Sequence, residues 1–484
     1  MSSLQNLAPA PLWRHFADIC SIPHPSRQEA ALIAHIEAFA KQQGLHHQRD
    51  HAGNLILRKP ASPGLEHHPG VILQSHLDMV PQKSDHSAHD FSRDPIRPQV
   101  VDGWVTATET TLGADNGIGV AAILAVMESD DLIHGPLEAL LTVNEEAGMD
   151  GAMGLEPGIL QGKWLLNLDS EQEGELYVGC AGGIDATLTL PLERGNHREG
   201  AGFAVVISGL AGGHSGIDIH LPRGNANRLL AELLLPFAER GDLTLGGFEG
   251  GSLRNAIARR AEAIVATAAS DAQTLTAELQ QAAAELQSHW ADDEPDLAIR
   301  IHRCPIEQPT LNGSSSLRLL NAILTCPHGV FTMHPDLAGV VETSNNLARV
   351  TLQQDHAQLL CLARSAREAG RDEVCATIGE VAKAVGAALE LAGAYPGWTP
   401  NPSSPLLATL NALHTKLFGQ PAEIKVIHAG LECGLLAAAY PQWEMISFGP
   451  TICFPHSPSE KVEIASVERF WRYLCHSLER LATS

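Results

Sequence analysis

The sequence lacks the features of several common protein classes. Its nine cysteines include no C-x-x-C pair, so neither a disulfide framework nor a structural zinc site is expected, and the thiols are expected in the core of a protein from a reducing compartment. No run approaches the ~20 apolar residues of a membrane-spanning helix. Residues 1–20 also lack the cationic start and continuous apolar stretch of a signal peptide. We therefore expect a cytoplasmic protein with no membrane partner.

Basic residues are scarce, and two familiar hydrolase motifs are missing. Lys and Arg number 32 against 56 Asp and Glu, which gives a formal net charge of −24 and argues against nucleic acid as a partner. The sequence has no G-x-S-x-G elbow and no phosphate-binding loop ending in Lys-Ser/Thr. It therefore lacks the motifs that serine hydrolases and nucleotide hydrolases require. The surplus of acids would suit a site for cations.

The hydrophobic pattern of the first 185 residues predicts an α/β fold. Short apolar runs that are typical of buried strands alternate with segments whose apolar residues recur at helical spacing. The strands are expected at 54–57, 71–74, 137–143 and 164–168, and the helices at 27–44 and 116–129. This order favours a mostly parallel sheet sandwiched by helices.

The pattern changes from about residue 186 onward. A strand is expected at 204–208, and helices are expected at 225–240, 271–290 and 372–393. A cluster of Pro and Gly at 395–402 predicts a hinge between domains. Helix-like and strand-like segments then resume and end in a helix at 465–481.

His76 and Asp78 lie two residues apart near the end of an expected strand, in QSHLDM. Residues at this spacing point to the same face of an extended chain. Asp78 could then accept a hydrogen bond from one imidazole nitrogen of His76 while the other nitrogen binds a metal ion. The alternative, a surface histidine that happens to lie near an aspartate, fits the pair equally well when it is taken alone.

Five further polar residues fall where strands or stiff turns end. Asp115, in LGADNGIG, precedes an expected helix and could instead be an ordinary N-cap. Glu145 and Glu146 follow the strand at 137–143, and Asp169 follows the next strand; His456 lies between two prolines in FPHSP. In an open α/β sheet, ligands bind at the carboxyl ends of the strands. The convergence of these side chains predicts a site there.

Two imidazoles and three carboxylates suit two divalent ions, with one carboxylate bridging them. Such ligands favour Zn²⁺, with Co²⁺ and Mn²⁺ as alternatives, over Ca²⁺. A hydroxide held between the ions would attack a carbonyl group, and a spare carboxylate would take its proton. Adjacent strand residues face opposite ways, so Glu145 and Glu146 are expected to divide these tasks. The residues alone leave open which glutamate does which.

With these motifs the sequence resembles the co-catalytic zinc aminopeptidase and dipeptidase superfamily that includes carnosinases and aminoacylases, and within it the Xaa-His dipeptidases. The resemblance spans residues 76 to 459 in family order. The motifs that carry it are SHLDMV, TLGADNGIGVAA, TVNEEAGMDGA, NLDSE, AGGHSG and FPHSPSE.

The resemblance implies a role for each of these site residues. Asp115 would bridge the two ions, with His76 and Asp169 completing one metal site. Glu146 and His456 would complete the other metal site. The two catalytic residues would be Asp78, which orients the histidine of the first site, and Glu145, the general base. A cis peptide is also implied between Asp115 and Asn116.

The resemblance also implies a domain organisation. Residues 1–185 and 397–484 would form one catalytic domain, and 186–396 an inserted α+β lid that binds substrate and could serve in a homodimer. His214 would polarise the substrate carbonyl, from its own subunit or across a dimer. For His214 the alternative is an ordinary histidine in a Gly-rich turn. Asn255 and Arg364 are weaker candidates for binding the substrate's carboxylate, and a lone arginine is ordinarily a solvated surface residue.

The function implied is a metallo-dipeptidase that hydrolyses Xaa-His and other dipeptides, including the β-alanyl-histidine type. An aminotripeptidase or an N-acyl amino acid hydrolase of the same superfamily is an alternative. A non-catalytic metal-binding relative is another, although the candidate base and all five candidate ligands are present. An alternative from a different class is a dinucleotide-dependent oxidoreductase, which would use Gly117 and Gly119 at the start of a helix. That function would give no role to His76 or His456.

Overall fold

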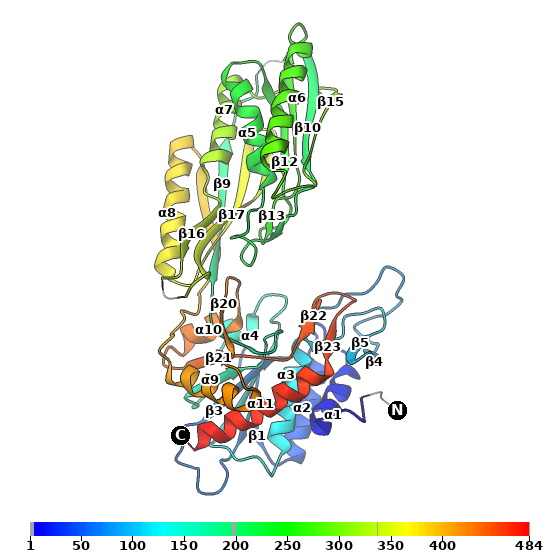
Figure 1. The fold of residues 1–484 in the computed structure, drawn as a ribbon, viewed down its shortest axis with the longest axis vertical. Helices are drawn as coiled ribbons and strands as arrows, with labels where there is room; N and C mark the ends of the chain where they lie inside the picture. Colours follow the sequence, from blue (N-terminus) through cyan, green and yellow to red (C-terminus); the bar gives the residue numbers. More distant parts are fainter. Residues whose placement is uncertain (1–3, 196–199, 336, 484) are drawn as a thin grey trace. The chain divides into compact units, whose positions relative to one another are not determined.

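The computed structural model describes residues 4–195, 200–335 and 337–483 (Figure 1). The chain forms two compact units. Unit 1 comprises Met1–Gly179, Trp398–Val426 and Leu431–Ser484, and unit 2 comprises Cys180–Gly397 with the short segment Ile427–Gly430. Each unit has a large sheet and a hydrophobic core of its own.

Unit 1 is built on an eight-stranded sheet in the order β1-β2-β6-β3-β7-β21-β8-β20. Its central strands β6, β3, β7 and β21 run parallel, whereas β1 and β2 pair antiparallel with their neighbours and β8 pairs antiparallel with β21. The strands are β1 His46–Arg49, β2 Leu55–Lys59, β3 Val71–His76, β6 Leu137–Thr142, β7 Trp164–Asn167, β8 Glu175–Cys180, β20 Glu423–Ile427 and β21 Glu444–Ser447.

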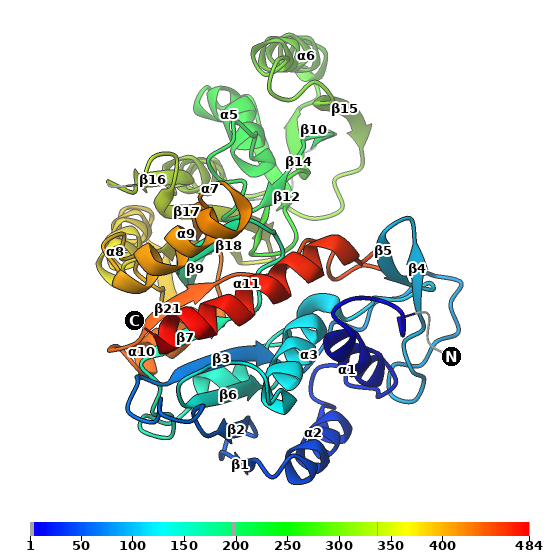
Figure 2. The ribbon, with the colours of Figure 1, turned by 60° about the horizontal axis from the view of Figure 1, so that its bottom comes forward.

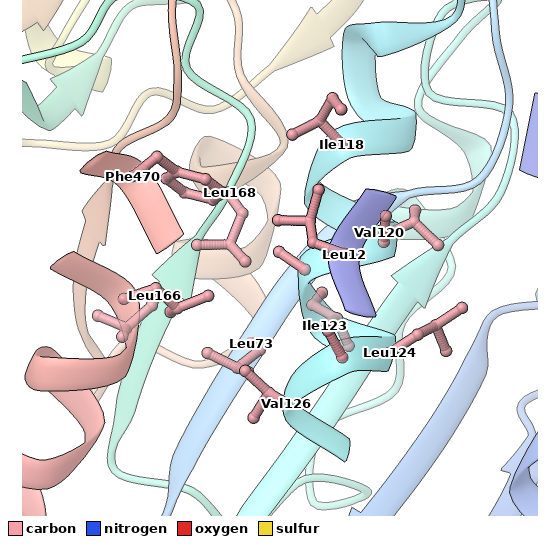
Figure 3. Close-up of a cluster of buried hydrophobic side chains, with 14 of the residues drawn as sticks. Leu12, Leu73, Ile118, Val120, Ile123, Leu124, Val126, Leu166, Leu168 and Phe470 are labelled. Carbon is pink, nitrogen blue, oxygen red and sulfur yellow. The ribbon is translucent and has the colours of Figure 1, made fainter. Parts of the chain in front are cut away.

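The core of unit 1 fills the space between this sheet and its helices. Leu73 of β3 and Leu166 of β7 meet Ile123 of helix α3 and Phe470 of helix α11 in one buried cluster (Figure 3). Helix α1 packs along α3 (Figure 2). The helices of unit 1 are α1 Ala10–Cys20, α2 Ala30–Gln42, α3 Ala114–Glu128, α4 Asp150–Met153, α9 Pro405–Phe418, α10 Glu432–Ala439 and α11 Ile464–Ala482.

Side chains alternate between the two faces of β3. Val71 and Leu73 point into the core, and Gln74 and His76 therefore point to the other face of the sheet. A small four-stranded sheet in the order β22-β23-β5-β4 completes unit 1. Its strands are β4 Pro98–Val101, β5 Trp104–Ala107, β22 Ile452–Cys453 and β23 Lys461–Glu463.

Unit 2 contains an antiparallel nine-stranded sheet in the order β15-β10-β14-β12-β17-β18-β9-β19, with β16 paired to β17. The strands are β9 Gly182–Pro191, β10 Gly200–Ser208, β12 Thr244–Gly250, β14 Ala261–Ala268, β15 Ala298–Cys304, β16 Gly329–Met333, β17 Val341–Leu352, β18 His356–Ser365 and β19 Ala388–Tyr395. The helices that pack against them are α5 Ala226–Glu239, α6 Ala272–His289, α7 Gly313–Thr325 and α8 Glu368–Val385. Two short strands, β11 Gly213–His214 and β13 Ala256–Ile257, pair with each other.

The predicted fold class is confirmed, with one error among the elements. The helix expected at 372–393 ends at Val385, and residues 388–395 form the edge strand β19. Gly386 explains the break, because it has a φ of 71°, a left-handed conformation that ends a helix and that glycine adopts without steric cost. None of the helices described has the length and apolarity that crossing a bilayer requires.

Candidate active site

The first predicted ligand, His76, is the last residue of β3 and is 2% exposed. Its Nε2 lies 3.2 Å from Oδ1 of Asp115 and 3.3 Å from Oδ1 of Asp169. Asp169 follows β7, the strand beside β3. Asp115 has non-helical backbone angles within the first turn assigned to α3, whose N-cap residue is Gly113. Asp115 is therefore not the N-cap residue of this helix.

A second histidine approaches Asp115 from the other side. Nε2 of His456 lies 3.0 Å from Oδ2 of Asp115 and 2.9 Å from Oε1 of Glu146. Asp115 thus presents one carboxylate oxygen to each histidine. Three of these residues, His76, Asp115 and Glu146, offer ligand atoms that all lie within 4.8 Å of one another, a spacing that could hold a metal ion.

The charges of this cluster are consistent with a cation site. Burial by itself would raise the pKa of Asp115, but hydrogen bonds from His456 and His76 bring it below its ordinary value. Hydrogen bonds to Asp115 and Glu146 raise the pKa of His456 to about 11. The carboxylates thus gather positive charge around them, and the donor set of imidazole nitrogens and carboxylate oxygens fits divalent cations.

Asp78 holds the neighbouring glutamates in place. Its carboxylate accepts hydrogen bonds from the backbone N–H of Glu145, at 2.9 Å, and of Glu146, at 3.1 Å, and from the hydroxyl of Ser26. The Nδ1 of His76 is 3.0 Å from the backbone oxygen of Asp78 and 3.5 Å from its Oδ1. The backbone carbonyl of Asp78 is thus the nearer acceptor for the ring.

Glu145 and Glu146 lie in a turn after β6 rather than on the strand itself. Asn144 enters this turn with a φ of 56°. The alternation of strand side chains therefore does not apply to the two glutamates, whose side chains are placed by the turn instead. Burial, together with the nearby carboxylates of Asp169 and Glu432, raises the pKa of Glu145 well above its ordinary value.

The substrate-binding candidates lie in unit 2. Nδ1 of His214 accepts hydrogen bonds from the backbone N–H of Gly216, at 3.2 Å, and of Ile217, at 3.0 Å. Burial lowers the pKa of His214 to about 4, and the charge of Arg364 contributes. The ring is therefore neutral and carries its proton on Nε2. Asn255 precedes β13, the strand that pairs with His214.

Arg364, on β18, is 4% exposed and is therefore no solvated surface arginine. Its Nε donates to the hydroxyl of Ser215, at 3.3 Å, and its Nη1 to the hydroxyl of Tyr395, at 2.8 Å. Both partners are neutral, so these hydrogen bonds leave the charge of the guanidinium uncompensated.

The geometry can now be compared with known proteins. The model of peptidase family M20/M25/M40 matches residues 72–480. The chain belongs to this family. A cytosol non-specific dipeptidase of Escherichia coli (strain K12) is 46% identical to the peptidase over 485 residues, which cover 99% of each chain. The expected family and the expected enzyme class, a hydrolase of peptide bonds, are confirmed.

Solved structures match the whole peptidase. The crystal structure of aminoacylhistidine dipeptidase from Vibrio alginolyticus superposes with a TM-score of 0.91 at 46% sequence identity and covers 99% of this chain and 98% of that chain. An aminopeptidase PepT structure from Bacillus cereus, at 16% identity and a TM-score of 0.59, covers 98% of this chain and 99% of that one and shares the fold.

The start of α3 argues against the dinucleotide-binding alternative. The backbone N–H groups of residues 112–115 donate to the buried carboxylate of Glu460, so this helix N-terminus already holds an anionic group of the protein. Gly119 serves close packing, since a Cβ there would lie 2.7 Å from the backbone oxygen of Leu168. The peptidase also has the cis peptide expected between Asp115 and Asn116.

Sequence reasoning missed two buried glutamates next to the site. Glu460 stands in the motif FPHSPSE, four residues after His456, which was a usable signal. Glu432, at the start of α10, accepts hydrogen bonds from Gln74, at 2.6 Å, and Thr142, at 2.7 Å, and is 1% exposed. No spacing in the sequence connects Glu432 with strands about 300 residues earlier.

Proposed function

We propose that the peptidase is a di-metal dipeptidase. The observation that carries this proposal is the position of Asp115 between His76 and His456, with one carboxylate oxygen toward each. Asp169 stands beside the first histidine and Glu146 beside the second. These five residues would hold two ions, with Asp115 as the bridge.

The metal proposed is Zn²⁺, with Co²⁺ or Mn²⁺ able to replace it. A ligand set of two imidazoles and three carboxylates favours these ions over Ca²⁺ and Mg²⁺. Bound there, the pair would supply Lewis-acid polarisation of a peptide carbonyl and a water of lowered pKa. Asp78 contacts the ring of His76 through its backbone carbonyl and holds the turn that carries Glu145 through its carboxylate, so one residue positions both a ligand and the base.

Glu145 is proposed as the general base. Its backbone is fixed by Asp78, its carboxylate is buried, and its pKa is raised, which brings a carboxylate closer to the range where it can accept and return a proton. It would take a proton from the attacking water and deliver it to the leaving amine. Glu146, which pairs with His456, is proposed as a metal ligand instead.

The substrate class proposed is the dipeptide, including Xaa-His and β-alanyl-histidine. The Escherichia coli relative is named a non-specific dipeptidase and the Vibrio relative an aminoacylhistidine dipeptidase.

We propose residues 186–396 as the substrate-binding lid. Arg364 supplies a buried cation for the substrate's carboxylate and His214 a neutral Nε2–H donor for its carbonyl oxygen, with Asn255 as a further donor. The cytosolic name of the Escherichia coli relative supports a cytoplasmic location.

A panel of substrates tests this proposal. Metal-free protein is supplied with Zn²⁺, Co²⁺ or Mn²⁺ and offered β-alanyl-histidine, other dipeptides, tripeptides and N-acetyl amino acids. We expect hydrolysis of dipeptides only after a metal is added, at a stoichiometry of two ions per chain. Hydrolysis of N-acetyl amino acids without dipeptides would contradict the substrate class, and a preference for tripeptides would move the function to an aminotripeptidase.

A further inference from the structure

Glu460 is a buried carboxylate that binds the turn carrying Asp115. It is 2% exposed. Its Oε2 accepts the backbone N–H of Leu112, at 2.7 Å, and of Gly113, at 3.0 Å. Its Oε1 accepts the N–H of Ala114, at 2.8 Å, and of Asp115 itself, at 3.2 Å. Four consecutive N–H groups thus converge on one side chain.

The turn is shaped for this acceptor. Gly113 has a φ of 71°, a left-handed conformation that lets successive N–H groups point toward one anion. These N–H groups lie at the start of α3, and Gly113 makes no side-chain cap because it has no side chain. Without Glu460, four buried donors would lose their acceptor, and each unsatisfied donor carries a desolvation cost.

The other end of Glu460 is fixed to the loop of His456. The N–H of Glu460 donates to the backbone oxygen of Ser457, at 3.0 Å, and Ser457 donates its hydroxyl to the oxygen of Phe454, at 2.8 Å. The backbone oxygen of Glu460 accepts a hydrogen bond from Thr106 of β5. Directly after Glu460, β23 pairs with β5 (Figure 1).

From this geometry we propose that Glu460 is a positioning residue that sets the carboxylate of Asp115 opposite the imidazole of His456. The two side chains come from segments 341 residues apart and meet at 3.0 Å. The carboxylate of Glu460 holds the backbone of the Asp115 turn, and its own backbone is bonded to the loop of His456. The spacing of the two segments is therefore fixed without a metal ion. This inference rests on the proposed function, in which both residues bind metal.

The chemistry of the contact predicts which substitution damages it. In Glu460→Gln, one oxygen still accepts two N–H groups, but the amide nitrogen faces the other two donors and cannot accept from them. Glu460→Asp keeps the charge on a side chain one methylene shorter. We expect the glutamine variant to distort the turn of Asp115, and the aspartate variant to distort it less.

The matched control is Glu138→Gln. Glu138 is also a buried carboxylate of unit 1, and it accepts the backbone N–H of Gln161, at 2.7 Å, and of Gly162, at 2.8 Å. It also pairs with Arg58. Glu138 is the second residue of β6, at the opposite end of the strand from the turn of Glu145. Its loss should lower stability without changing the site.

The experiment measures Co²⁺ binding by the metal-free proteins, through competition with a chelator and through the visible absorption spectrum of the bound ion. For Glu460→Gln we expect a loss of Co²⁺ affinity of roughly 10- to 100-fold and a changed spectrum. We expect a smaller loss for Glu460→Asp, and wild-type affinity and spectrum for Glu138→Gln.

Other outcomes would overturn the inference. If Glu460→Gln unfolds more easily but binds Co²⁺ with wild-type affinity and spectrum, the residue is only structural. Failure of the wild-type protein to bind Co²⁺ would overturn the proposed function as well. Hydrogen exchange supplies a test that needs no variant, because the amides of residues 112–115 should be protected in the metal-free wild-type protein, and rapid exchange there would refute the contact.

Discussion

Acidic side chains outnumber basic ones around the proposed metal ligands of the peptidase. Asp115, Glu146 and Asp169 contact His76 and His456, and Asp78 and Glu145 are close by. Buried like charges raise one another's pKa and oppose folding unless cations receive them. Burial raises the pKa of both Asp169 and Glu146. The site is therefore built with a deficit of positive charge that two divalent ions would remove.

The division of labour between the two glutamates gives the first prediction. Glu145→Gln keeps the shape of the side chain and its backbone bonds to Asp78, but it cannot accept a proton. We expect kcat for a dipeptide to fall by about 10²- to 10⁴-fold while two metal ions remain bound. Metal content by elemental analysis and turnover of β-alanyl-histidine check this. Loss of a metal ion from the variant would instead identify Glu145 as a ligand.

The residues around the site differ in how far the sequence predicts them. His76 and Asp169 follow strands, and the carboxyl ends of parallel strands lie at one sheet edge, so their convergence was predictable. The separate tasks of Glu145 and Glu146 came from resemblance, because the turn that places them is set by tertiary contacts with Asp78. Glu460 binds backbone groups about 345 residues away, and such pairing leaves no local pattern.

At the scale of elements, unit 2 contains two further histidines, His328 and His428, whose pKa values are lowered by their surroundings. His328 lies between α7 and β16, and its Nδ1 accepts the backbone N–H of Leu347 at 3.3 Å. Burial, with a contribution from the charge of Arg228, lowers the pKa of His328 to about 4 from an ordinary 6.5. Burial likewise lowers the pKa of His428 to about 3. Protonation of either ring opposes the folded state.

This pattern predicts acid sensitivity of unit 2. The folded-state pKa of His328 lies below its unfolded value, so the unfolded chain binds more protons as pH falls below 6.5, and stability is lost progressively down to about pH 4. His328→Asn retains an acceptor for the N–H of Leu347 without a titratable ring. We expect it to recover about 2 kcal/mol of the loss at pH 5, measured by urea unfolding at pH 7.5 and pH 5.

The control for this prediction is His302→Asn, at an exposed position of β15. It should leave the difference in unfolding free energy between the two pH values unchanged. An equal effect of both substitutions, or none from His328→Asn, would show that the buried ring does not titrate as its surroundings indicate.

Elements are predicted best where one hydrophobic pattern decides them. Helix α11 has Phe470, Leu474, Leu478 and Leu481 buried along one side, and the helix expected at 465–481 agrees with it to within one residue at each end. The alanine-rich stretch at 386–393 carries no such pattern, and there the pairing of β19 with β9 decides the structure. Long-range pairing overrode local propensity at that edge.

At the scale of the whole molecule, each unit has a large hydrophobic core of its own. All five proposed metal ligands belong to unit 1, whereas His214, Asn255 and Arg364 belong to unit 2. A ligand stabilises only the unit whose folded state binds it, by RT ln(1 + [L]/Kd) for each site. At a free metal concentration 100 times the Kd, one ion contributes about 2.7 kcal/mol. Metal should therefore act on the two units unequally.

The last prediction follows from this arrangement. Calorimetry of the metal-free protein should show two unfolding transitions, and adding Zn²⁺ should move only the transition of unit 1 to higher temperature. Hydrogen exchange near each midpoint assigns the transitions, through the amides of β3 and β7 for unit 1 and those of β17 and β18 for unit 2. Replacement of His76 by Ala should reduce the shift, because the first ion loses a ligand while the site of Glu146 and His456 keeps its own. A single transition that Zn²⁺ shifts as a whole would mean that the units unfold together, and a shift confined to unit 2 would contradict the assignment of the metal ligands.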